Sequence, residues 1–472
     1  MWDSAMSPSL PPPVGRQKEV LVLPPQGHAV VLGTAGSGKT TLAIHRALYL
    51  AHPDTDHHGR TLLVTFNRCL VSHLRALARP ISSMVVVENY HRFARGYLSH
   101  RGKMRPYCIC GPDLQRQLCQ RAVTEATTGD APPAVLSRPI DLLVQEFDWL
   151  AQHGIKTEAE YVEGERIGRA GTRIVRGDRP AVFGVYQRYL ELRRARGKSY
   201  DWQDLSHTVL DEFGVDDGER KYRHVVIDEG QDFSPMMLRS LAAAIPPDGS
   251  LTLFGDMAQQ IYGNRMSWRS AGLSVKDVWE FEENYRNTRQ VAQLALAMAE
   301  MPNFTDDADL VEPKSPTADG PLPALVSFDT EEKEAHFVVQ QAVRLSKTGT
   351  VAVLFRDREQ EKAWNSLLPD RATRLHGELD RWPTSPTGIF HGTYHSAKGL
   401  EFDAVILPRM SQARLPHPPD VTALGQQEAA ARDSRLLYVA VTRSKSTLIL
   451  THSGDPTGLL PTGTDLYKRT SR

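Results

Sequence analysis

A glycine-rich segment near the start of the chain constrains the fold more than any other feature. Residues 33–40 read GTAGSGKT, which fits the pattern G-x-x-x-x-G-K-[ST]. The apolar run His28–Leu32 precedes this segment, and the helix-like sequence TLAIHRALYL follows it. We therefore expect a strand, a glycine loop and a helix in that order, within a parallel α/β sheet. Such a loop binds the phosphates of a nucleotide.

The residue types in this loop indicate how the nucleotide is held. Glycines let backbone N–H groups approach phosphate oxygens that larger side chains would block. We expect Lys39 to reach the β- and γ-phosphates and the Thr40 hydroxyl to ligate Mg²⁺. The predicted nucleotide-binding residues of the loop are Gly33, Thr34, Ala35, Gly36, Ser37, Gly38, Lys39, Thr40 and Thr41.

A second motif supplies the acids that hydrolysis of ATP needs. The apolar run Val225–Ile227 ends in Asp228 and Glu229. We expect Asp228 to bind Mg²⁺ and Glu229 to act as the base beside the attacking water. A protein that uses hydrolysis to drive movement must also sense whether the γ-phosphate is present. The candidate sensors are Gln259, Arg286 and Arg443. The predicted cofactors are thus ATP and Mg²⁺.

Apolar β-branched runs recur along the chain and are mostly separated by helical patterns, which indicates parallel α/β sheets. Besides His28–Leu32, the expected strands are Thr61–Thr65, Met84–Val87, His224–Ile227, Leu251–Phe254, Thr350–Phe355, Ala404–Leu407 and Thr447–Leu450. Two α/β halves divide near Trp279. The expected organisation is a disordered tail at 1–15, a first domain at 16–278 with a mostly helical insertion at about 97–199, and a second domain at 279–472. A Pro- and Asp-rich stretch, Met301–Pro323, indicates a loop or linker.

Composition excludes several classes of protein. Hydrophobic residues make up 40% of the 472 residues and charged residues 24%, which is typical of a globular domain and not of a disordered chain. No apolar run approaches the roughly 20 residues of a membrane span, and the Pro- and Ser-rich start lacks the pattern of a signal peptide. We therefore expect a cytoplasmic protein without a membrane partner. Its cysteines, at 69, 108, 110 and 119, lack a matching Cys or His pair for zinc, so we expect free thiols.

Overall charge does not indicate a nucleic-acid partner. Lys plus Arg equals Asp plus Glu, and the formal net charge is zero, so any such binding needs a local groove. The Arg-bearing stretches Arg166–Arg179 and Arg188–Lys198 are candidates for a positive surface. For each stretch taken alone, a solvated helix face is the favoured explanation.

The ordered set of motifs resembles the UvrD/Rep family of superfamily 1 DNA helicases, and the resemblance extends from Gln17 to about Lys445. The segments that carry it, in chain order, are TFNRCLVSHL from Thr65, NYHRFA from Asn89, YDWQDL from Tyr200, DEGQD from Asp228, GDMAQQIY from Gly255, ENYRNT from Glu283, TYHSAKGLEF from Thr393 and LLYVAVTR from Leu436. They are similar to the family's TFTNKAA, T-F-H-S-F, D-F-D-D-L, DExQD, GDxxQSIY, NYRST, HSAKGLEF and LLYVAMTR segments.

The resemblance implies roles for individual residues. Gln17 lies at the distance of the family's adenine-reading glutamine, Gln259 is the γ-phosphate sensor, and Arg443 is the arginine finger. Arg286 and Tyr285 line the nucleotide cleft, and Glu401 lies near the nucleotide. The residues implied to contact DNA are Phe66, Asn67, His91, Tyr262, Trp268 and His395.

The resemblance also implies two RecA-like cores with ATP between them, and single-stranded DNA that crosses both. The implied activity is translocation from 3′ to 5′ with strand separation at a tailed duplex. Bases stack on aromatic rings without sequence preference, and Trp268 is the first stacking candidate. Trp268 is separated from Tyr262 by a longer spacing than the family has, so a tryptophan packed between the cores remains the alternative.

One region departs from the family pattern and keeps a second function open. Family helicases carry a sizeable inserted 2B subdomain in their second half. The corresponding region of this chain is short and spans only residues of about 300–390, so we expect a vestigial or absent 2B subdomain and a compact form. The alternative function is a nucleotide-dependent DNA sensor that regulates a nuclease, as in Gabija-like phage defence. A nuclease or repair protein is then a further partner, with repair and defence equally open. A P-loop kinase or GTPase is disfavoured because the sequence lacks N-K-x-D, and no nuclease constellation is evident.

Overall fold

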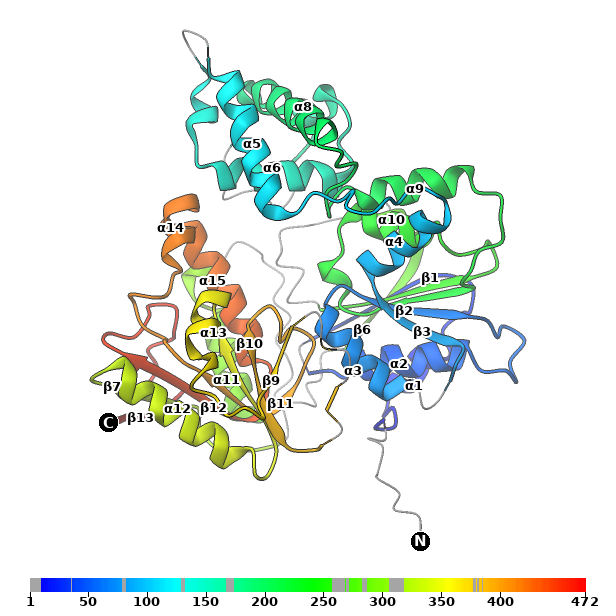
Figure 1. Ribbon diagram of the computed structural model, residues 1–472. Helices are drawn as coiled ribbons and strands as arrows, with labels where there is room; N and C mark the ends of the chain where they lie inside the picture. The colour runs from blue at the N-terminus through cyan, green and yellow to red at the C-terminus, as the bar shows by residue number, and fades with distance from the viewer. Residues whose placement is uncertain are drawn as a thin grey trace.

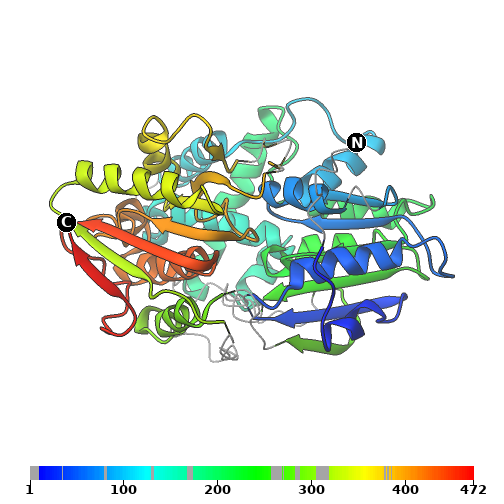
Figure 2. The same cartoon turned by 90° about the horizontal axis from the view of Figure 1, so that it is seen from below.

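The computed structural model describes residues 10–34, 36–78, 82–128, 132–166, 174–256, 268, 271–281, 287–304, 318–376, 379, 382–383 and 385–472. Two parallel sheets, one in each half of the described chain, organise the fold (Figures 1 and 2). The α/β prediction with two sheets is thus confirmed. Residues 1–9 of the expected tail lie outside the described residues.

The first sheet has six strands in the order β3-β2-β4-β5-β1-β6. Their bounds are β1 Gly27–Gly33, β2 Thr61–Thr65, β3 Val85–Asn89, β4 His224–Ile227, β5 Ser250–Asp256 and β6 Val275–Phe281. Every pair of neighbours is parallel. The carboxyl ends of all six strands therefore meet at one edge, where ligands bind in folds of this class.

Alternation along the strands sends side chains to both faces of this sheet. Val31 and Leu63 face one apolar cluster, and Val30 and Leu62 face another. The first face is covered by α2 (Lys39–Leu50) and α3 (Arg68–Ala78), and α1 (Gln17–Leu21) packs on α2. The second face is covered by α4 (Tyr90–His100), α9 (Leu205–Val215) and α10 (Pro235–Ala242). Burial on both faces is what the near-continuous apolar runs of these strands predict.

Helices between residues 112 and 195 form a bundle with its own core. It contains α5 (Pro112–Ala126), α6 (Ile140–His153), α7 (Glu158–Glu163) and α8 (Arg179–Ala195), with short 3₁₀ turns η1 (Ala134–Ser137) and η2 (Arg176–Asp178). Buried residues from Cys110 to Leu192 form one separate cluster. Figure 1 shows this bundle beside the first domain, above α9 and α10. The start of the expected range, residues 97–100, belongs to α4, which packs on the first sheet.

The second sheet has seven strands in the order β13-β7-β12-β11-β8-β10-β9. Their bounds are β7 Ala324–Phe328, β8 Thr350–Phe355, β9 Thr373–Arg374, β10 Gly388–Thr393, β11 Phe402–Leu407, β12 Ser444–Ser453 and β13 Lys468–Ser471. One face packs on α12 (Glu331–Leu345) and α13 (Arg358–Asn365). The other packs on α11 (Arg289–Ala299) and α15 (Gln426–Val441). α14 (Pro418–Leu424) precedes α15 and contacts α6 of the helical bundle.

Two expected boundaries can be compared with the strands. β6 continues the first sheet to Phe281, so the chain leaves that sheet slightly after the expected division at 278 and 279. The region at about 300–390 supplies β7, β8, β9 and part of β10 to the second sheet. Among the residues described there, we find no separate subdomain.

The two halves share an apolar core. A single cluster of buried side chains runs from α2 and α3 of the first domain to α11 and α15 of the second. Figure 2 shows the two sheets side by side, the first in blue and green and the second in yellow to red. No helix in the described part of the chain is long and apolar enough to cross a membrane. All four cysteines are buried and free.

Candidate nucleotide site at the domain interface

The glycine loop joins the carboxyl end of β1 to the start of α2, as predicted. Gly36 and Gly38 have φ angles of +87° and +82°, which favour glycine because other residues are strained there. The loop is also tightly packed. A Cβ on Gly33 would lie 2.4 Å from Ser37 Oγ, and the Thr34 N–H donates to the Phe281 carbonyl at 3.0 Å.

Lys39 folds back over this loop. Its Nζ donates to the carbonyl oxygens of Gly33 at 2.8 Å and Thr34 at 2.6 Å, and only 8% of the residue is exposed. A buried ammonium needs such partners because desolvation without them is costly. The charge of Lys39 is thus held inside the turn, where the bound phosphates would lie.

Asp228, directly after β4, lies beside the helix that starts with Lys39. It is 1% exposed, and the Thr40 hydroxyl hydrogen-bonds to its carboxylate. Its Oδ2 has no hydrogen-bond partner among the described residues. Burial and the neighbouring Glu229 carboxylate raise the pKa of Asp228. A buried carboxylate oxygen without a partner, next to a hydroxyl, suits a hard cation such as Mg²⁺.

The described residues contain no cluster of three or more His, Cys, Asp or Glu side chains that could hold a metal. Mg²⁺ commonly takes only one or two protein ligands and otherwise keeps water and substrate phosphates. Asp228 and Thr40 therefore fit Mg²⁺ bound together with a nucleotide.

Glu229 occupies the centre of the site in an uncommon backbone conformation. Its φ of +56° lies in the left-handed region, which non-glycine residues seldom adopt except at sites that the surrounding fold constrains. Burial alone would raise the pKa of Glu229, but the positive charges of Lys398, Arg443 and Lys39 outweigh it and lower the pKa. The carboxylate is thus kept ionised and able to accept a proton.

Two of those three positive charges come from the second domain. Lys398 forms an ion pair with Asp232, four residues after Asp228. Gly399, with a φ of +78°, lies so close to the first domain that a Cβ there would be 2.6 Å from a Leu70 methyl group and 3.4 Å from Glu229 Oε1. The acidic pair of one domain and the segment around Lys398 of the other therefore form one site.

Arg443 follows α15 and is 2% exposed. Its Nε donates to the Val439 carbonyl at 3.0 Å and one terminal nitrogen to the Leu400 carbonyl at 3.4 Å. These bonds hold the guanidinium within the second domain, and its charge acts on Glu229 across the interface. Glu401, half-buried, immediately precedes β11.

Gln17 lies against the glycine loop from the other side. Its Nε2 donates to the Ser37 carbonyl at 3.0 Å, and its Oε1 accepts from the Val14 N–H at 3.0 Å. The residue is 8% exposed. Of the predicted nucleotide residues, Gln17, Lys39, Thr40, Asp228 and Glu229 are thus brought together, while Thr41 is half-buried on α2. Ala35, Gln259, Tyr262, Tyr285 and Arg286 lie outside the described residues.

Two of the residues implied to contact DNA lie together on the first domain. The rings of Phe66 and His91 are 5.5 Å apart, and Trp202 lies edge-on to His91 at 5.2 Å. Arg68 lies over the Trp202 ring at 5.6 Å. Burial lowers the pKa of His91 to about 4, so the ring is uncharged at neutral pH. The result is a partly buried aromatic group with one cation.

The other described candidates lie elsewhere. Asn67 donates from Nδ2 to the carbonyls of Lys398 at 2.6 Å and Ser396 at 3.3 Å, so its amide joins the two domains. Trp268 is half-buried against the core between the first sheet and α10. His395 is exposed, at the end of β10.

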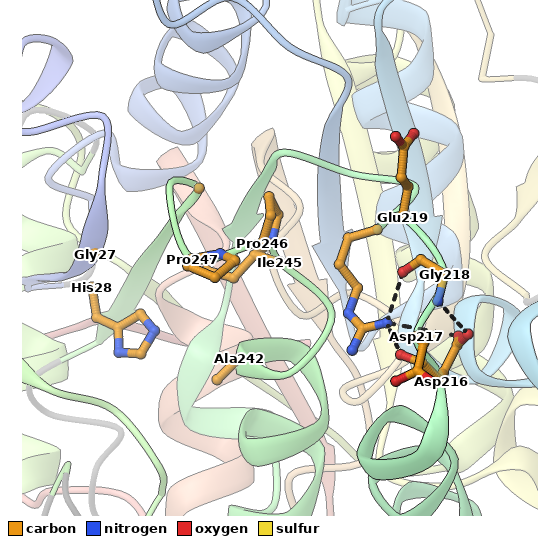
Figure 3. Close-up of a pocket in the computed structure, with 12 residues that line it drawn as sticks. Gly27, His28, Asp216, Asp217, Gly218, Glu219, Ala242, Ile245, Pro246 and Pro247 are labelled. Atoms are coloured by element: carbon orange, nitrogen blue, oxygen red, sulfur yellow. Dashed lines mark hydrogen bonds and ion pairs between the residues drawn. The ribbon is translucent and has the colours of Figure 1, made fainter.

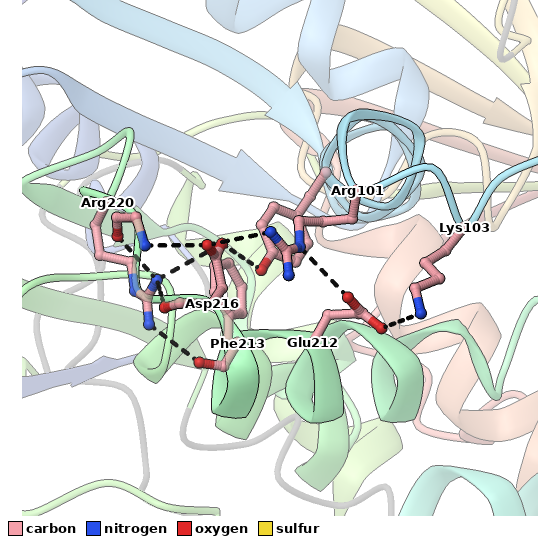
Figure 4. Close-up of polar contacts among 8 residues, drawn as sticks. Arg101, Lys103, Glu212, Phe213, Asp216 and Arg220 are labelled. Atoms are coloured by element: carbon pink, nitrogen blue, oxygen red, sulfur yellow. Dashed lines mark hydrogen bonds and ion pairs between the residues drawn. The ribbon is translucent and has the colours of Figure 1, made fainter.

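A cavity of about 520 Å³ lies at the opposite end of the first sheet (Figure 3). It is lined by Gly27 and His28, at the start of β1, and by the turns 216–220 and 245–249. The glycine loop follows the carboxyl end of β1, so this cavity is not the nucleotide site. The acidic turn beside it is held by ion pairs, in which Asp216 and Glu212 contact Arg101 at 3.4 and 3.3 Å (Figure 4).

The prediction from sequence missed three residues in these sites. Lys398 and Asp232 both belong to recognised motifs, but nothing in their spacing indicates that they pair. Trp202 lies in the segment YDWQDL, and its position beside His91 follows only from the packing of α4 against the start of α9.

Comparison with known proteins agrees with this geometry. The model of the UvrD/REP helicase N-terminal domain matches residues 14–277, and that of the UvrD-like helicase C-terminal domain matches 371–454. The ATP-dependent DNA helicase UvrD2 of Mycobacterium tuberculosis is 26% identical over 92% of this chain and 78% of its own length. A probable DNA helicase of Mycoplasma pneumoniae is 22% identical over 93% of this chain and 83% of its own. The ATP-dependent DNA helicase PcrA of Leuconostoc citreum is 22% identical over 71% of this chain and 46% of its own.

Proposed function

Because the chain belongs to the UvrD/REP helicase family, we propose that it hydrolyses ATP to move from 3′ to 5′ along single-stranded DNA and to separate strands at a tailed duplex. The observation that carries this proposal is that positive charges from both domains, Lys39 of the first and Lys398 and Arg443 of the second, act on Glu229 and lower its pKa. A base that is tuned by both domains links hydrolysis to their relative position.

The proposed catalytic roles follow from the contacts. Lys39 would bind the β- and γ-phosphates, and Thr40 and Asp228 would hold Mg²⁺, which neutralises developing negative charge on the phosphates. Glu229 would accept a proton from the attacking water. Arg443 would stabilise the transferring phosphoryl group, a contribution worth about 10³ to 10⁵ in rate in this reaction class. Gln259 and Arg286, outside the described residues, remain proposed sensors.

Base recognition is assigned to the first domain. Gln17 uses one N–H and one oxygen lone pair in its bonds to Ser37 and Val14. Its second N–H and second lone pair match the edge of adenine, as in other bidentate amide–adenine pairs. Tyr285 and Glu401 are the further proposed nucleotide contacts.

The proposed path of DNA crosses both domains. Phe66 and His91, with Trp202 beside them, offer ring faces on which bases stack without sequence preference. Trp268, Tyr262 and His395 are the further proposed contacts. Asn67, which bonds to the carbonyl of Lys398, would relay movement between the domains as well as contact the strand.

The proposed organisation has a first RecA-like domain that carries the helical bundle and a second RecA-like domain without a separate 2B subdomain. We place the protein in the cytoplasm, with DNA as its partner. The compact second domain also favours a second candidate function, a nucleotide-dependent DNA sensor that regulates a nuclease in repair or phage defence. In that case hydrolysis would occur without strand separation by the isolated chain.

Strand displacement tests the proposal. The substrates are duplexes with a 3′ tail, a 5′ tail or no tail, with and without ATP and Mg²⁺, and the control protein is Lys39→Ala. We expect ATP-dependent displacement from the 3′-tailed duplex alone. Displacement from the 5′ tail alone would contradict the direction. Turnover of ATP without displacement from any substrate would favour the sensor.

A further inference from the structure

A fully buried arginine on α2 holds the segment that carries Gln17. Arg46 is 0% exposed and lies seven residues after Lys39, two helical turns along the same face of α2. Its terminal nitrogens donate to the carbonyls of Leu21 at 2.6 Å and Pro24 at 2.9 Å. Its Nε donates to Thr252 Oγ1 on β5 at 3.4 Å.

These partners are unusual for a buried guanidinium. The hydrogen bonds of Arg46 go to two carbonyls and a hydroxyl, and burial lowers its pKa to about 10. A buried cation is costly unless its donors are well satisfied. One of these carbonyls belongs to the last residue of α1, Leu21, and the other to Pro24 in the turn that follows it.

The helix α1 needs support from outside. α1 has five residues and no side-chain N-cap, and so short a helix is not stable by itself. Val20, which is fully buried, and Leu23 anchor it to the core. Arg46 binds the carbonyl of its last residue, Leu21, where the helix dipole also favours a cation.

We propose that Arg46 is a positioning residue for recognition of the nucleotide base. Its hydrogen bonds fix the position of α1 relative to α2. Gln17 lies on α1, and its Nε2 is so close to the glycine loop that a Cβ added to Gly38 would be 3.1 Å from it. A shift of α1 therefore moves the Gln17 amide relative to the phosphate loop. This inference rests on the proposed use of ATP, and Arg46 itself would touch no part of the nucleotide.

The test measures equilibrium binding of ATP and of GTP to the full chain, by competition against a fluorescent ATP analogue. The proteins are the wild type, Arg46→Lys, Gln17→Ala and the double variant. Lysine keeps the charge but cannot donate to both carbonyls in the fork geometry of arginine. We expect the preference for ATP over GTP to fall about tenfold in Arg46→Lys, as in loss of one bidentate base contact. In the Gln17→Ala background, Arg46→Lys should change the preference no further.

Two variants separate positioning from general stability. Thr252→Val removes the third bond of the same guanidinium without touching α1, and it should keep the preference. Val20→Ala loosens α1 without touching Arg46, and it should lower the preference in the same direction. If Arg46→Lys does not fold, Val20→Ala still tests whether the position of α1 sets the preference, and an unchanged preference there would overturn the inference.

An unchanged preference in Arg46→Lys, or a loss that adds fully to that of Gln17→Ala, would overturn the inference. So would equal binding of ATP and GTP by the wild type. A wild-type protein that prefers ATP but does not hydrolyse it would overturn the proposed function alone. Hydrolysis with an unchanged preference in Arg46→Lys would overturn the positioning role alone.

Discussion

Lys398 of the second domain forms an ion pair with Asp232 of the first, and the two residues are separated by 166 positions in sequence. Asp232 is half-buried and interacts electrostatically with Glu229, and Lys398 contributes most among the positive charges that lower the pKa of Glu229. The pair therefore contributes both to contact between the domains and to the ionisation of the proposed base.

Loss of Lys398 should impair turnover more than stability. Lys398→Met leaves Asp232 and Glu229 as neighbouring acids with less positive charge, so the pKa of Glu229 rises and the domains meet less tightly. We expect DNA-stimulated ATP hydrolysis to fall about a hundredfold, in line with loss of a general base. Lys333→Met is the matched control, because Lys333 pairs with Asp329 on the surface and such pairs contribute little. Equal activity of the two variants would contradict this role.

The Asn67 side chain makes two kinds of hydrogen bond, one that caps α3 and one that joins the two domains, and substitutions can separate them. Its Oδ1 accepts from the Cys69 N–H at 2.9 Å at the start of α3, and its Nδ2 donates to the second domain. Asn67→Asp keeps the acceptor, which caps the helix, but presents a carboxylate to the carbonyls of Ser396 and Lys398. We expect an unchanged melting temperature and a large loss of DNA-stimulated turnover.

The companion variant, Asn67→Ala, removes both contributions. It should also lower stability by about 1 kcal/mol, the usual cost of a lost N-cap. If Asn67→Asp hydrolyses ATP as the wild type does, the bond between the domains has no part in coupling.

The positions of Thr40 and Asp228 lead us to expect that the affinity for ATP depends on Mg²⁺. Thr40→Val removes the hydroxyl beside the unpartnered Asp228 Oδ2 and keeps the shape of the side chain. We expect weaker binding of ATP in Mg²⁺ and unchanged binding in EDTA. Thr40→Ser, which restores a hydroxyl, should bind as the wild type does. A loss of affinity that is equal with and without Mg²⁺ would indicate that Thr40 contributes only to packing.

The burial of His224 leads us to expect that the free energy of unfolding decreases in acid. Its Nδ1 lies 2.8 Å from Ser250 Oγ and its Nε2 lies 2.8 Å from the His57 carbonyl, and burial lowers its pKa from 6.5 to about 4. The folded protein keeps the ring neutral while the unfolded chain takes up a proton below about pH 6.5. The stabilisation is therefore complete above pH 6.5 and is lost as the pH falls towards 4, by on the order of 2 to 3 kcal/mol.

Thermal unfolding between pH 7.5 and pH 4.5 measures this effect. The melting temperature of His224→Gln should fall less steeply with pH than that of the wild type. His52→Gln is the control, because His52 is exposed. Parallel curves for all three proteins would assign the acid sensitivity to other groups.

Much of the fold could be predicted from local sequence. All eight expected strands are confirmed, because runs such as Leu62–Val64 and Val225–Ile227 are buried on both faces and read as continuous apolar segments. β6 was missed because its sequence, VKDVWEF, places Lys and Asp within an edge strand. β10, GIFHGT, was missed because two glycines and a histidine obscure its pattern.

Part of the candidate site could likewise be predicted from the sequence, and part could not. Lys39, Thr40, Asp228 and Glu229 could be placed from sequence because parallel strands bring their carboxyl ends to one edge. The contacts of Asn67 and Asp232 with the second domain could not, because they join residues more than 160 positions apart. The sequence predicts only that Arg46 lies on a helix. Its role could not be predicted, because its partners are backbone carbonyls, which every residue has.

ATP hydrolysis by the wild type, Lys39→Ala and Arg443→Ala, with and without single-stranded DNA, tests the central claim most directly. We expect strong stimulation of the wild type by DNA and its loss in both variants, by about 10³-fold or more for Arg443→Ala. Arg443→Ala should still bind ATP, because Lys39 and the rest of the glycine loop are unchanged. Hydrolysis that does not depend on DNA, or that survives in Arg443→Ala, would contradict a motor whose two domains share one active site.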